Sequence, residues 1–239
     1  MTRANSVPLA GMMAEAARDL AAQTELDEAL KQVSDLALRT VACDRASITL
    51  RLPGGNYETF AATDDKAQQA DALQYSLNEG PCVDALWNNG YYRVEDVGTD
   101  PRWPQWGPQA AELGIHSILS IHLFTSNLPV GALNLYSTRY RTYSDEDVEV
   151  AKIVAAHASV AFARIRAEKD LWAAVDSRHL IGQAQGILMG KLNLTAEQAF
   201  AVLQRYSQRS NTKLRDVAVK IIDTRALPAD SGTASRSST

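Results

Sequence analysis

The residues best suited to chemistry lie near the carboxyl end of the chain, between residues 171 and 225. This stretch holds eight Lys or Arg against four acidic residues, a balance of +4. Residues 1 to 170 carry −8 and residues 226 to 239 are neutral, which together give the whole-chain charge of −4. Lysine and arginine neutralise phosphates and so give an affinity that falls with salt. An acidic body with a small basic end indicates that the end binds a polyanion and that the body does something else.

Helical periodicity predicts three helices in this basic end. The first contains Gly182 and Gly186, each of which costs about 1 kcal/mol relative to alanine in a helix interior. Spaced four apart, the two glycines share one face, where another helix or a nucleic-acid backbone could approach closely. Close helix packing without a ligand is an equally good explanation. About 55 residues in three helices bury little surface alone, so we expect this end to pack against a neighbouring part of the protein or against a second copy of the chain.

The second and third helices are predicted from their starting residues. Thr195 is followed three positions later by Gln198, the capping-box pattern that begins a helix. Asn211 or Thr212 can cap the third helix in the same way, because short polar side chains accept hydrogen bonds from exposed backbone amides.

The run IGQAQGILMGKLNLTAEQAFAVLQRYSQRSNTKLRDVA resembles an ANTAR domain, the three-helix RNA-binding output module of bacterial transcription antiterminators. The resemblance covers residues 171 to 224. It implies binding, as a homodimer, to an RNA of two stem-loops whose formation competes with a transcription terminator. In the motif, Ala184 and Gly186 are the small residues and Met189 is apolar.

Side-chain chemistry together with this motif selects the residues expected to contact RNA. Cationic side chains neutralise phosphates, and amides can hydrogen-bond the unstacked bases of loops. For Arg178 a solvated helix face is the alternative interpretation, and for Met189 a place in the core. The candidates are Arg178, Gln183, Ala184, Gln185, Gly186, Met189, Lys191, Lys213 and Arg215. A DNA-binding helix-turn-helix is a further alternative, although no helix carries a dense stripe of Arg, Asn and Gln.

The first 166 residues alternate between helix and strand patterns, which predicts an α+β fold with an antiparallel sheet. Strands are expected at residues 46–52, 57–63, 91–94, 117–124 and 130–137. The segment EGPCVDALWNNGYYRVEDVGTDPRWP and the later run VGALNLYSTRYRTYSDEDVEVAKIVAAHASVAF resemble the GAF domain, a small-molecule sensor fold related to PAS. This second resemblance covers about residues 20 to 166.

These patterns predict a definite domain organisation. We expect a flexible N-terminus (1–10), a GAF sensor domain (11–166), an ANTAR RNA-binding domain (171–225) and a disordered tail (226–239). A signalling helix or coiled-coil linker (144–176) overlaps the end of the GAF domain. The fold class is therefore an α+β GAF domain, followed by a long coiled-coil helix and a three-helix ANTAR bundle.

The long helix is expected to run from about residue 144 to 190, and it carries apolar residues at spacings of three and four. Such spacing is typical of an imperfect two-stranded coiled coil, although Glu168 occupies a seam position. The predicted seam residues are Val154, Ala158, Ala161, Ile165, Trp172 and Val175. We hypothesise that a signal changes the rotation or spacing of paired helices and so the separation of two RNA-binding surfaces.

A ligand pocket in the GAF region would be walled by aromatic residues, which suit a flat or apolar ligand. The candidate ligand-binding residues are Cys82, Trp87, Tyr92 and Trp103, and a plain hydrophobic core explains them equally well. Cys82 follows Pro81 at a predicted helix start, where its thiol pKa could be lowered, or it could be a small buried apolar residue. The sequence does not identify the ligand or any cofactor.

Several classes of protein are disfavoured. Cys43 and Cys82 are the only two cysteines, too few for a disulfide framework or a tetrahedral zinc site. No apolar run approaches the ~18 residues of a membrane span and no signal-peptide pattern opens the chain, so we expect a cytoplasmic protein without membrane partners. We find no nucleophile elbow or phosphate-cradling loop and expect no enzyme. The alternatives are a DNA-binding or protein-binding regulator, or a ligand or redox sensor whose helical tail only dimerises.

Overall fold

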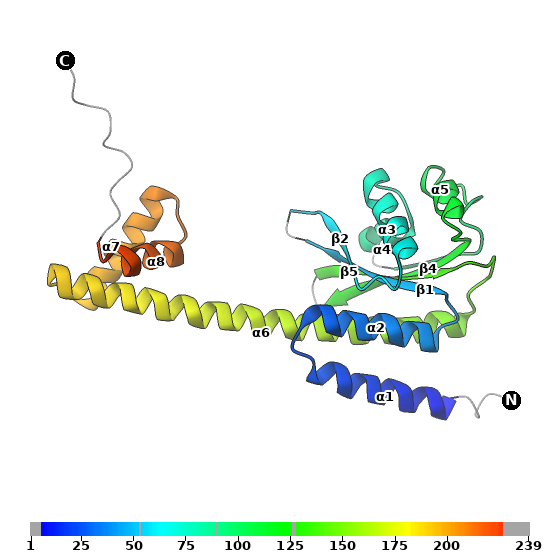
Figure 1. Ribbon diagram of the computed structural model, residues 1–239, viewed down its shortest axis with the longest axis horizontal. Helices are drawn as coiled ribbons and strands as arrows, with labels where there is room; N and C mark the ends of the chain where they lie inside the picture. The colour runs from blue at the N-terminus through cyan, green and yellow to red at the C-terminus, as the bar shows by residue number, and fades with distance from the viewer. Residues whose placement is uncertain (1–5, 53, 89, 126–127, 227–239) are drawn as a thin grey trace, which may run out of the picture. The chain divides into compact units, whose positions relative to one another are not determined.

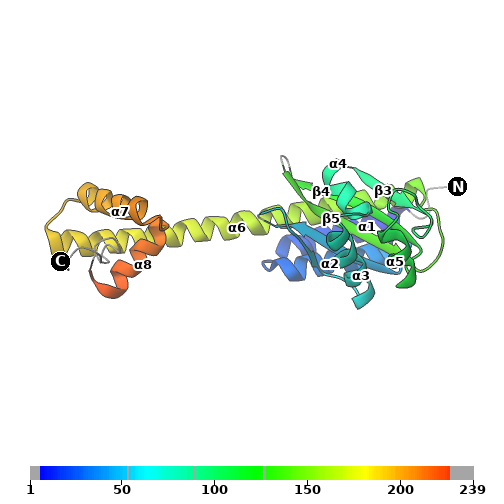
Figure 2. The same ribbon diagram turned by 90° about the horizontal axis from the view of Figure 1, so that it is seen from above.

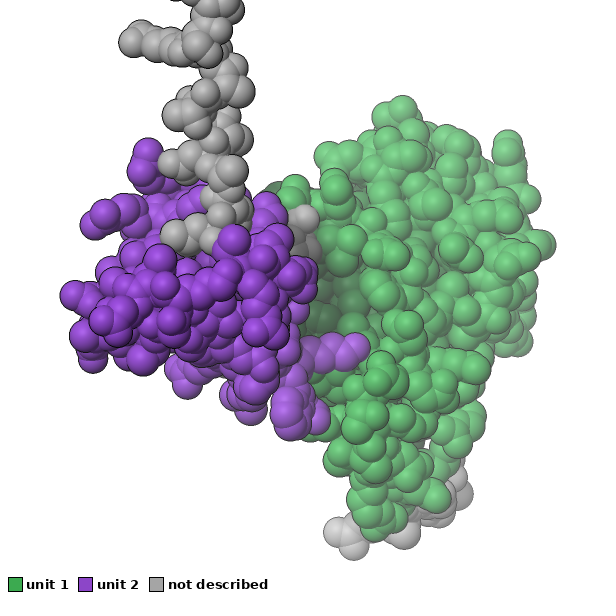
Figure 3. Space-filling model, turned by 60° about the vertical axis from the view of Figure 1, so that its left-hand side comes forward, with its two compact units in different colours: residues 1–166 green, residues 167–239 purple. Residues whose placement is uncertain are grey.

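The structure is a computed structural model that describes residues 6–52, 54–88, 90–125 and 128–226. The chain forms two compact units, residues 1–166 and residues 167–239, which Figure 3 shows in different colours. The first unit contains a sheet with helices on both faces, and the second contains helices only.

The first unit is built around a five-stranded sheet in the order β2-β1-β5-β4-β3. Every pair of neighbouring strands is antiparallel, which confirms the predicted α+β fold. The strands are β1 (Arg45–Arg51), β2 (Tyr57–Phe60), β3 (Tyr91–Val94), β4 (Ser117–Thr125) and β5 (Leu128–Ser137). The helices that precede or interrupt them are α1 (Ser6–Ala22), α2 (Leu26–Thr40), α3 (Asp65–Leu77), α4 (Pro81–Asn88) and α5 (Trp106–Glu112).

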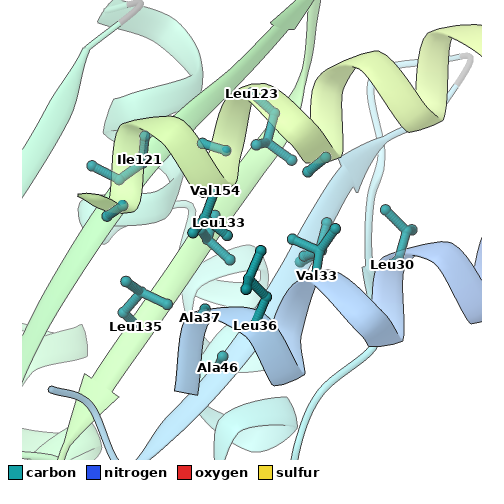
Figure 4. Close-up of a cluster of buried hydrophobic side chains, with 14 of the residues drawn as sticks. Leu30, Val33, Leu36, Ala37, Ala46, Ile121, Leu123, Leu133, Leu135 and Val154 are labelled. Atoms are coloured by element: carbon teal, nitrogen blue, oxygen red, sulfur yellow. The ribbon is translucent and has the colours of Figure 1, made fainter. Parts of the chain in front are cut away.

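Helices cover the two faces of the sheet in separate groups. In Figure 1, α3, α4 and α5 lie over one face, while α2 and the first part of α6 (Asp145–Leu192) lie against the other, with α1 outside them. The main apolar core fills the space between α2, α6 and the sheet. Figure 4 shows how Leu36 from α2 and Val154 from α6 converge on Leu133 of β5. Burial of such side chains is the main favourable term in folding.

The single helix α6 spans 48 residues, which confirms the predicted long helix. Its predicted coiled-coil seam needs correction, because four of the six seam residues are used inside the first unit. Val154, Ala158, Ala161 and Ile165 are buried in the core that also holds Leu133. The sheet and α2 cover this strip, so it cannot be the surface that meets a second helix.

The second unit consists of the end of α6 with α7 (Ala196–Ser210) and α8 (Leu214–Thr224), as Figure 2 shows. The three helices enclose a small apolar core of seven fully buried residues: Ala184, Leu188, Ala199, Leu203, Val217, Ala218 and Ile221. Each helix presents one apolar face to this core and a polar face to solvent, as expected for amphipathic helices.

The helix starts in the second unit confirm one prediction and correct another. Thr195 Oγ1 accepts a hydrogen bond from Gln198 N, and Gln198 Oε1 accepts one from Thr195 N at 2.9 Å, so the predicted capping box is present. The predicted cap of α8 is wrong, because Lys213 occupies that position and makes no side-chain cap bond. Asn211 instead ends α7 in the left-handed conformation, at φ 49°. Asparagine tolerates that conformation better than most residues, which explains its place there.

Candidate nucleic-acid interface

Most of the predicted RNA-contacting residues lie on the surface of the second unit. Arg178, Gln183, Gly186, Met189, Lys191, Lys213 and Arg215 are exposed. The Met189 side chain is 37% exposed, so it lies outside the buried core. The prediction fails for the side chain of Ala184, which is fully buried in the three-helix core. Gln185 is half-buried and donates through Nε2 to the Ala196 carbonyl at 3.1 Å, which joins α6 to the start of α7.

An open groove of about 580 Å³ lies between α6 and α8 in this unit. It brings together three of the predicted residues, Gln183, Gly186 and Lys191. The remaining residues that line it are Ile187, Gly190, Ile222 and Arg225. Gly190 and Arg225 are absent from the predicted set. The repeat of glycine at every fourth position from 182 to 190 could have identified the first of them, whereas Arg225 follows only from the way α8 ends.

The three glycines of α6 are not required by the packing of the chain itself. A Cβ atom added to Gly182, Gly186 or Gly190 would meet no other atom within 4 Å. Glycine in a helix interior is less stable than alanine by about 0.5 to 1 kcal/mol. Packing within this chain does not offset this cost, so of the explanations for the glycines only close approach by another molecule, either a helix or a nucleic-acid backbone, is left.

Two further cations lie outside the groove. Arg215 forms an ion pair with Asp176 at 3.0 Å, in which both side chains are about half exposed. Exposed pairs of this kind contribute only about 0 to 1 kcal/mol, so a phosphate can compete for the guanidinium. Lys213 is exposed at the N-cap of α8. Lys213 and Arg215 therefore lie apart from the groove-lining residues, and the charge of Arg215 is balanced by Asp176 and by Asp216, which is 4.0 Å away.

The predicted ligand-binding residues of the first unit lie in different surroundings. Trp103 is fully buried and its indole Nε1 donates to Asp84 Oδ2 at 2.9 Å. The Tyr92 ring contacts Trp103 edge-on, with 5.6 Å between centroids. Trp87 is 61% exposed and lies beneath the Arg51 guanidinium, 5.3 Å from its ring centroid. The Trp87 ring is therefore accessible to solvent, whereas the Trp103 ring is part of the buried core.

Cys82 is fully buried, and its environment contradicts the predicted lowered pKa. Burial, with the nearby Asp71 as a second cause, raises the pKa of the thiol to about 12. The thiol donates to Thr49 Oγ1 at 3.2 Å, and the Cys82 amide donates to Gln74 Oε1 at 2.8 Å. At neutral pH Cys82 is thus a protonated thiol inside a hydrogen-bonded layer, which does not favour thiolate chemistry.

That layer separates the sheet from α3 and is centred on Asp71, which is fully buried. Asp71 Oδ1 accepts hydrogen bonds from Asn134 Nδ2 at 3.0 Å and from the Tyr136 hydroxyl, and Oδ2 accepts one from Thr59 Oγ1 at 3.0 Å. Burial raises the pKa of the Asp71 carboxyl to about 6, despite these donors. Sequence reasoning missed this cluster, because polar residues that alternate along a strand usually indicate a solvated face.

The structure thus contains a five-stranded sheet domain that is followed, through α6, by a small helical unit whose groove is lined by Lys191 and Arg225. The GAF domain family model matches residues 23–163 and the ANTAR domain family model matches residues 169–222. The first match covers more than half of the chain, so the protein belongs to the GAF domain family. With its ANTAR domain it has the organisation of a GAF and ANTAR antiterminator.

Solved structures show the same fold in the first unit. The GAF domain of a phosphoenolpyruvate-protein phosphotransferase from Coxiella burnetii matches with a TM-score of 0.56 and 18% identity, over 70% of this chain and 99% of that one. A domain of a putative two-component sensor histidine kinase protein from Sinorhizobium meliloti 1021 matches with a TM-score of 0.52 and 20% identity, over 61% and 96%. Free methionine-R-sulfoxide reductase from Neisseria meningitidis matches with a TM-score of 0.51 and 13% identity, over 70% and 96%. At these identities the likeness shows the fold alone.

Among curated proteins, no relative matches the chain. GAF and ANTAR domains are regulatory and sensory domains, although free methionine-R-sulfoxide reductase, which has the same fold as the first unit, is an enzyme. No helix in the described ranges is long and apolar enough to cross a membrane. The described residues also contain no group of three or more His, Cys, Asp or Glu that could hold a metal ion.

Proposed function

We propose that this protein is a signal-responsive regulator of transcription antitermination that acts in the cytoplasm. In this proposal it binds an RNA of two stem-loops through its ANTAR domain, as a homodimer. ANTAR domains are RNA-binding antitermination modules and GAF domains are sensors, which supports the general class. The observation that carries the specific proposal is the open groove between α6 and α8, with its glycine floor and two cations.

The groove suits RNA because it combines three kinds of contact. Lys191 and Arg225 line it and supply positive charge for phosphates. Gln183 adds an exposed amide that can hydrogen-bond a base edge or a ribose hydroxyl. Gly186 and Gly190 leave their part of the surface without side chains, which lets a base or sugar approach the helix backbone.

The charge distribution supports binding at this end of the chain. Residues 171 to 225 have a net charge of +4, whereas residues 1 to 170 have −8. For the units themselves the charges are −7 for the GAF unit (residues 1–166) and +3 for the ANTAR unit (residues 167–239), so a polyanion is repelled by the first and attracted to the second. The GAF unit then remains available for its own signal.

For the signal, we propose a small molecule bound by the GAF domain, with Trp87 as the most accessible of the four candidate residues. Its exposed ring and the Arg51 guanidinium above it suit a flat, anionic ligand. Tyr92 and Trp103 pack in the core of the GAF unit, and Cys82 lies in the buried polar layer. Isothermal titration of Trp87→Ala against wild type tests this part, since an equal affinity for a ligand found by screening would exclude Trp87 from the site.

Competition binding tests the RNA proposal. The full chain is titrated with a labelled two-stem-loop RNA at one fixed salt concentration, against unlabelled scrambled RNA of equal length and duplex DNA of equal charge. We expect the stem-loop RNA to be preferred at least about tenfold, a difference of about 1.4 kcal/mol. Equal competition by scrambled RNA would refute the proposal, and stronger competition by duplex DNA would favour the DNA-binding alternative.

A pair of variants locates the contact. Lys191→Ala removes a cation that lines the groove, so the dependence of log affinity on log salt should become shallower by a slope of about 0.7 to 0.9. Arg205→Ala is the matched control, because Arg205 is an exposed cation on α7 that does not line the groove. An equal change in slope for both variants would place RNA elsewhere on the unit.

A further inference from the structure

The buried polar layer between the sheet and α3 contains a continuous chain of hydrogen bonds that ends at Asp71. Thr59 Oγ1 donates to Asp71 Oδ2 at 3.0 Å. The Tyr75 hydroxyl lies 2.8 Å from Thr59 Oγ1 and 2.7 Å from Thr49 Oγ1. The Cys82 thiol donates to Thr49 Oγ1 at 3.2 Å. This hydroxyl chain therefore joins α3, which carries Asp71 and Tyr75, to β2, β1 and the start of α4.

The charge of Asp71 fixes the direction in which these hydrogen bonds run, because each hydroxyl has a single hydrogen to donate. While the carboxylate is ionised it only accepts, so Thr59 gives its hydrogen to Asp71. Thr59 must then accept from Tyr75, and Tyr75 must accept from Thr49. Thr49 Oγ1 keeps both of its lone pairs for the thiol and for Asn134 Nδ2, which lies 3.1 Å away.

A proton on Asp71 Oδ2 would reverse this order. The carboxylic acid becomes a donor to Thr59, which then donates to Tyr75, which in turn donates to Thr49. Thr49 Oγ1 then faces three donors with two lone pairs, and its own hydrogen must leave Tyr75. A thiol is a weaker donor than a hydroxyl or an amide, so the hydrogen bond of the Cys82 thiol is the one that is lost.

We propose that the hydroxyl chain is a proton switch of the GAF unit, in which one proton taken up by Asp71 reverses its hydrogen bonds and releases the Cys82 thiol. The proton comes from solvent, forms an O–H bond at Oδ2 and returns to solvent when pH rises, and no electron is transferred. The switch transmits the charge of α3 to the start of α4. It goes beyond the proposed function, because it requires neither RNA nor a small-molecule ligand.

The surroundings of Asp71 favour a change of charge at this residue and not at its neighbours. The titratable groups around it are Tyr75 on α3, Tyr136 on β5 and Cys82 on α4; burial raises the pKa of each, so all three keep their protons at neutral pH. The strands β1, β2 and β4 contribute uncharged hydroxyl groups to the layer, and α5 contributes apolar side chains.

No cation stabilises the ionised form of this carboxyl group. Within the described residues, the contacts of Asp71 include no Lys, Arg or His. Burial is the larger effect and favours the acid, whereas the hydrogen-bond donors favour the carboxylate. The balance places the pKa of Asp71 at about 6, so a modest change in pH alters its charge.

Infrared spectroscopy of the full chain tests the switch, because the S–H stretching band reports whether a thiol donates a hydrogen bond. Cys43→Ala is the background, since it leaves Cys82 as the only thiol. The band should move to the higher frequency of a thiol without a hydrogen bond as pH falls through about 6. Asp71→Asn in this background should abolish the shift. It also removes the carboxylic acid C=O band by which the titration of Asp71 itself is followed.

A matched pair of tyrosine variants separates the hydroxyl chain from a general effect of pH. Tyr75→Phe keeps the ring but removes the hydroxyl that joins Thr59 to Thr49. The thiol band should then stay constant while the acid band of Asp71 still titrates. Tyr57→Phe is the control, because its ring contacts that of Tyr75, at 5.7 Å between centroids, but its hydroxyl takes no part in the chain. This variant should keep the shift.

Thr59→Val removes the next hydroxyl of the chain and tests the same link if Tyr75→Phe does not fold. A thiol shift that persists in either folded variant would overturn the proposal. A thiol band that stays constant in the background while Asp71 titrates would overturn it as well, and so would an Asp71 carboxyl that does not titrate near pH 6. Because RNA is absent from these measurements, failure of the proposed function leaves their outcome unchanged.

Discussion

Gly131 in the sheet of the GAF unit and the three glycines near the end of α6 have opposite surroundings. A Cβ atom on Gly131 of β5 would lie 1.9 Å from the Thr49 carbonyl oxygen, so the chain itself excludes any side chain there. In α6, Cβ atoms on Gly182, Gly186 and Gly190 would touch nothing. The comparison teaches that Gly131 is required by the packing of the sheet, whereas the glycines at the end of α6 leave open space on the surface of the helix.

The cores of the two units differ in the same sense. The GAF unit buries a polar layer around Asp71 whose oxygens accept bonds from Asn134, Tyr136 and Thr59. The ANTAR unit buries seven apolar residues and leaves its cations on the surface. The GAF unit therefore buries hydrogen-bonded polar groups in its interior, whereas the ANTAR unit carries its charged groups on its surface.

The largest expected effect is that of Gly131→Ala, which should lower the free energy of unfolding of the GAF unit by about 3 kcal/mol. The added methyl group would overlap the Thr49 carbonyl, and only a shift of two paired strands can relieve the overlap. Denaturant unfolding followed by the fluorescence of the buried Trp103 and Trp106 measures it. Gly182→Ala is the control, and a similar loss there would remove the contrast between the units.

The Asp71 carboxyl should make the stability of the GAF unit depend on pH. Its pKa in the folded state is about 6, above the ordinary 3.8, so folding favours the protonated form. The stabilisation is complete below about pH 4 and is lost as pH rises through about 6. Two pKa units correspond to about 3 kcal/mol at most.

Asp71→Asn removes that dependence, because the amide does not titrate. The difference in unfolding free energy between wild type and variant should shift in favour of the variant as pH rises from 4 to 7. Asp35→Asn, at an exposed position on α2, is the control. A constant difference across this range would show that the buried carboxyl does not titrate there.

A smaller effect is expected at the start of α7. Thr195→Ala removes the side chain that accepts from Gln198 N, and it should destabilise the ANTAR unit by about 1 kcal/mol. Thr212→Ala should cost less, since Thr212 does not cap α8. Thermal unfolding followed by circular dichroism compares the two. A larger loss of stability for Thr212→Ala would instead support the predicted role of Thr212 as the cap of α8.

The smallest effect is a gain. Gly186→Ala should stabilise the ANTAR unit by about 0.5 to 1 kcal/mol, because alanine is the better helix former and its methyl group meets open space. The same unfolding experiment measures it. Destabilisation would mean that Gly186 serves the packing of its own chain, as Gly131 does.

Local patterns predicted the strands, the long helix and the capping box, because these depend on residues a few positions apart. Long-range burial could not be predicted in the same way. Val154 and Val160 are both apolar residues of α6, but Val154 is buried against the sheet and Val160 is exposed. The sequence of the helix alone does not distinguish the two. The thiol of Cys82 follows the same rule, since its pKa depends on burial and on Asp71, eleven positions earlier in the chain.

Part of the groove could be predicted and part could not. Gln183, Gly186 and Lys191 share α6, so their proximity follows from helical periodicity. Arg225 reaches the groove because α8 packs back on α6 and ends in a left-handed residue, at φ 55°. That contact depends on tertiary packing, which the sequence pattern of a single helix does not contain.

The most direct measurement compares the RNA affinities of Gly186→Leu and Gly182→Leu in the full chain, at equal salt. Both positions have open space around them, but only Gly186 lines the groove. If the glycine floor receives RNA, Gly186→Leu should weaken binding of the two-stem-loop RNA at least about tenfold, while Gly182→Leu stays within about threefold of wild type. Equal affinities for the two variants would contradict the account.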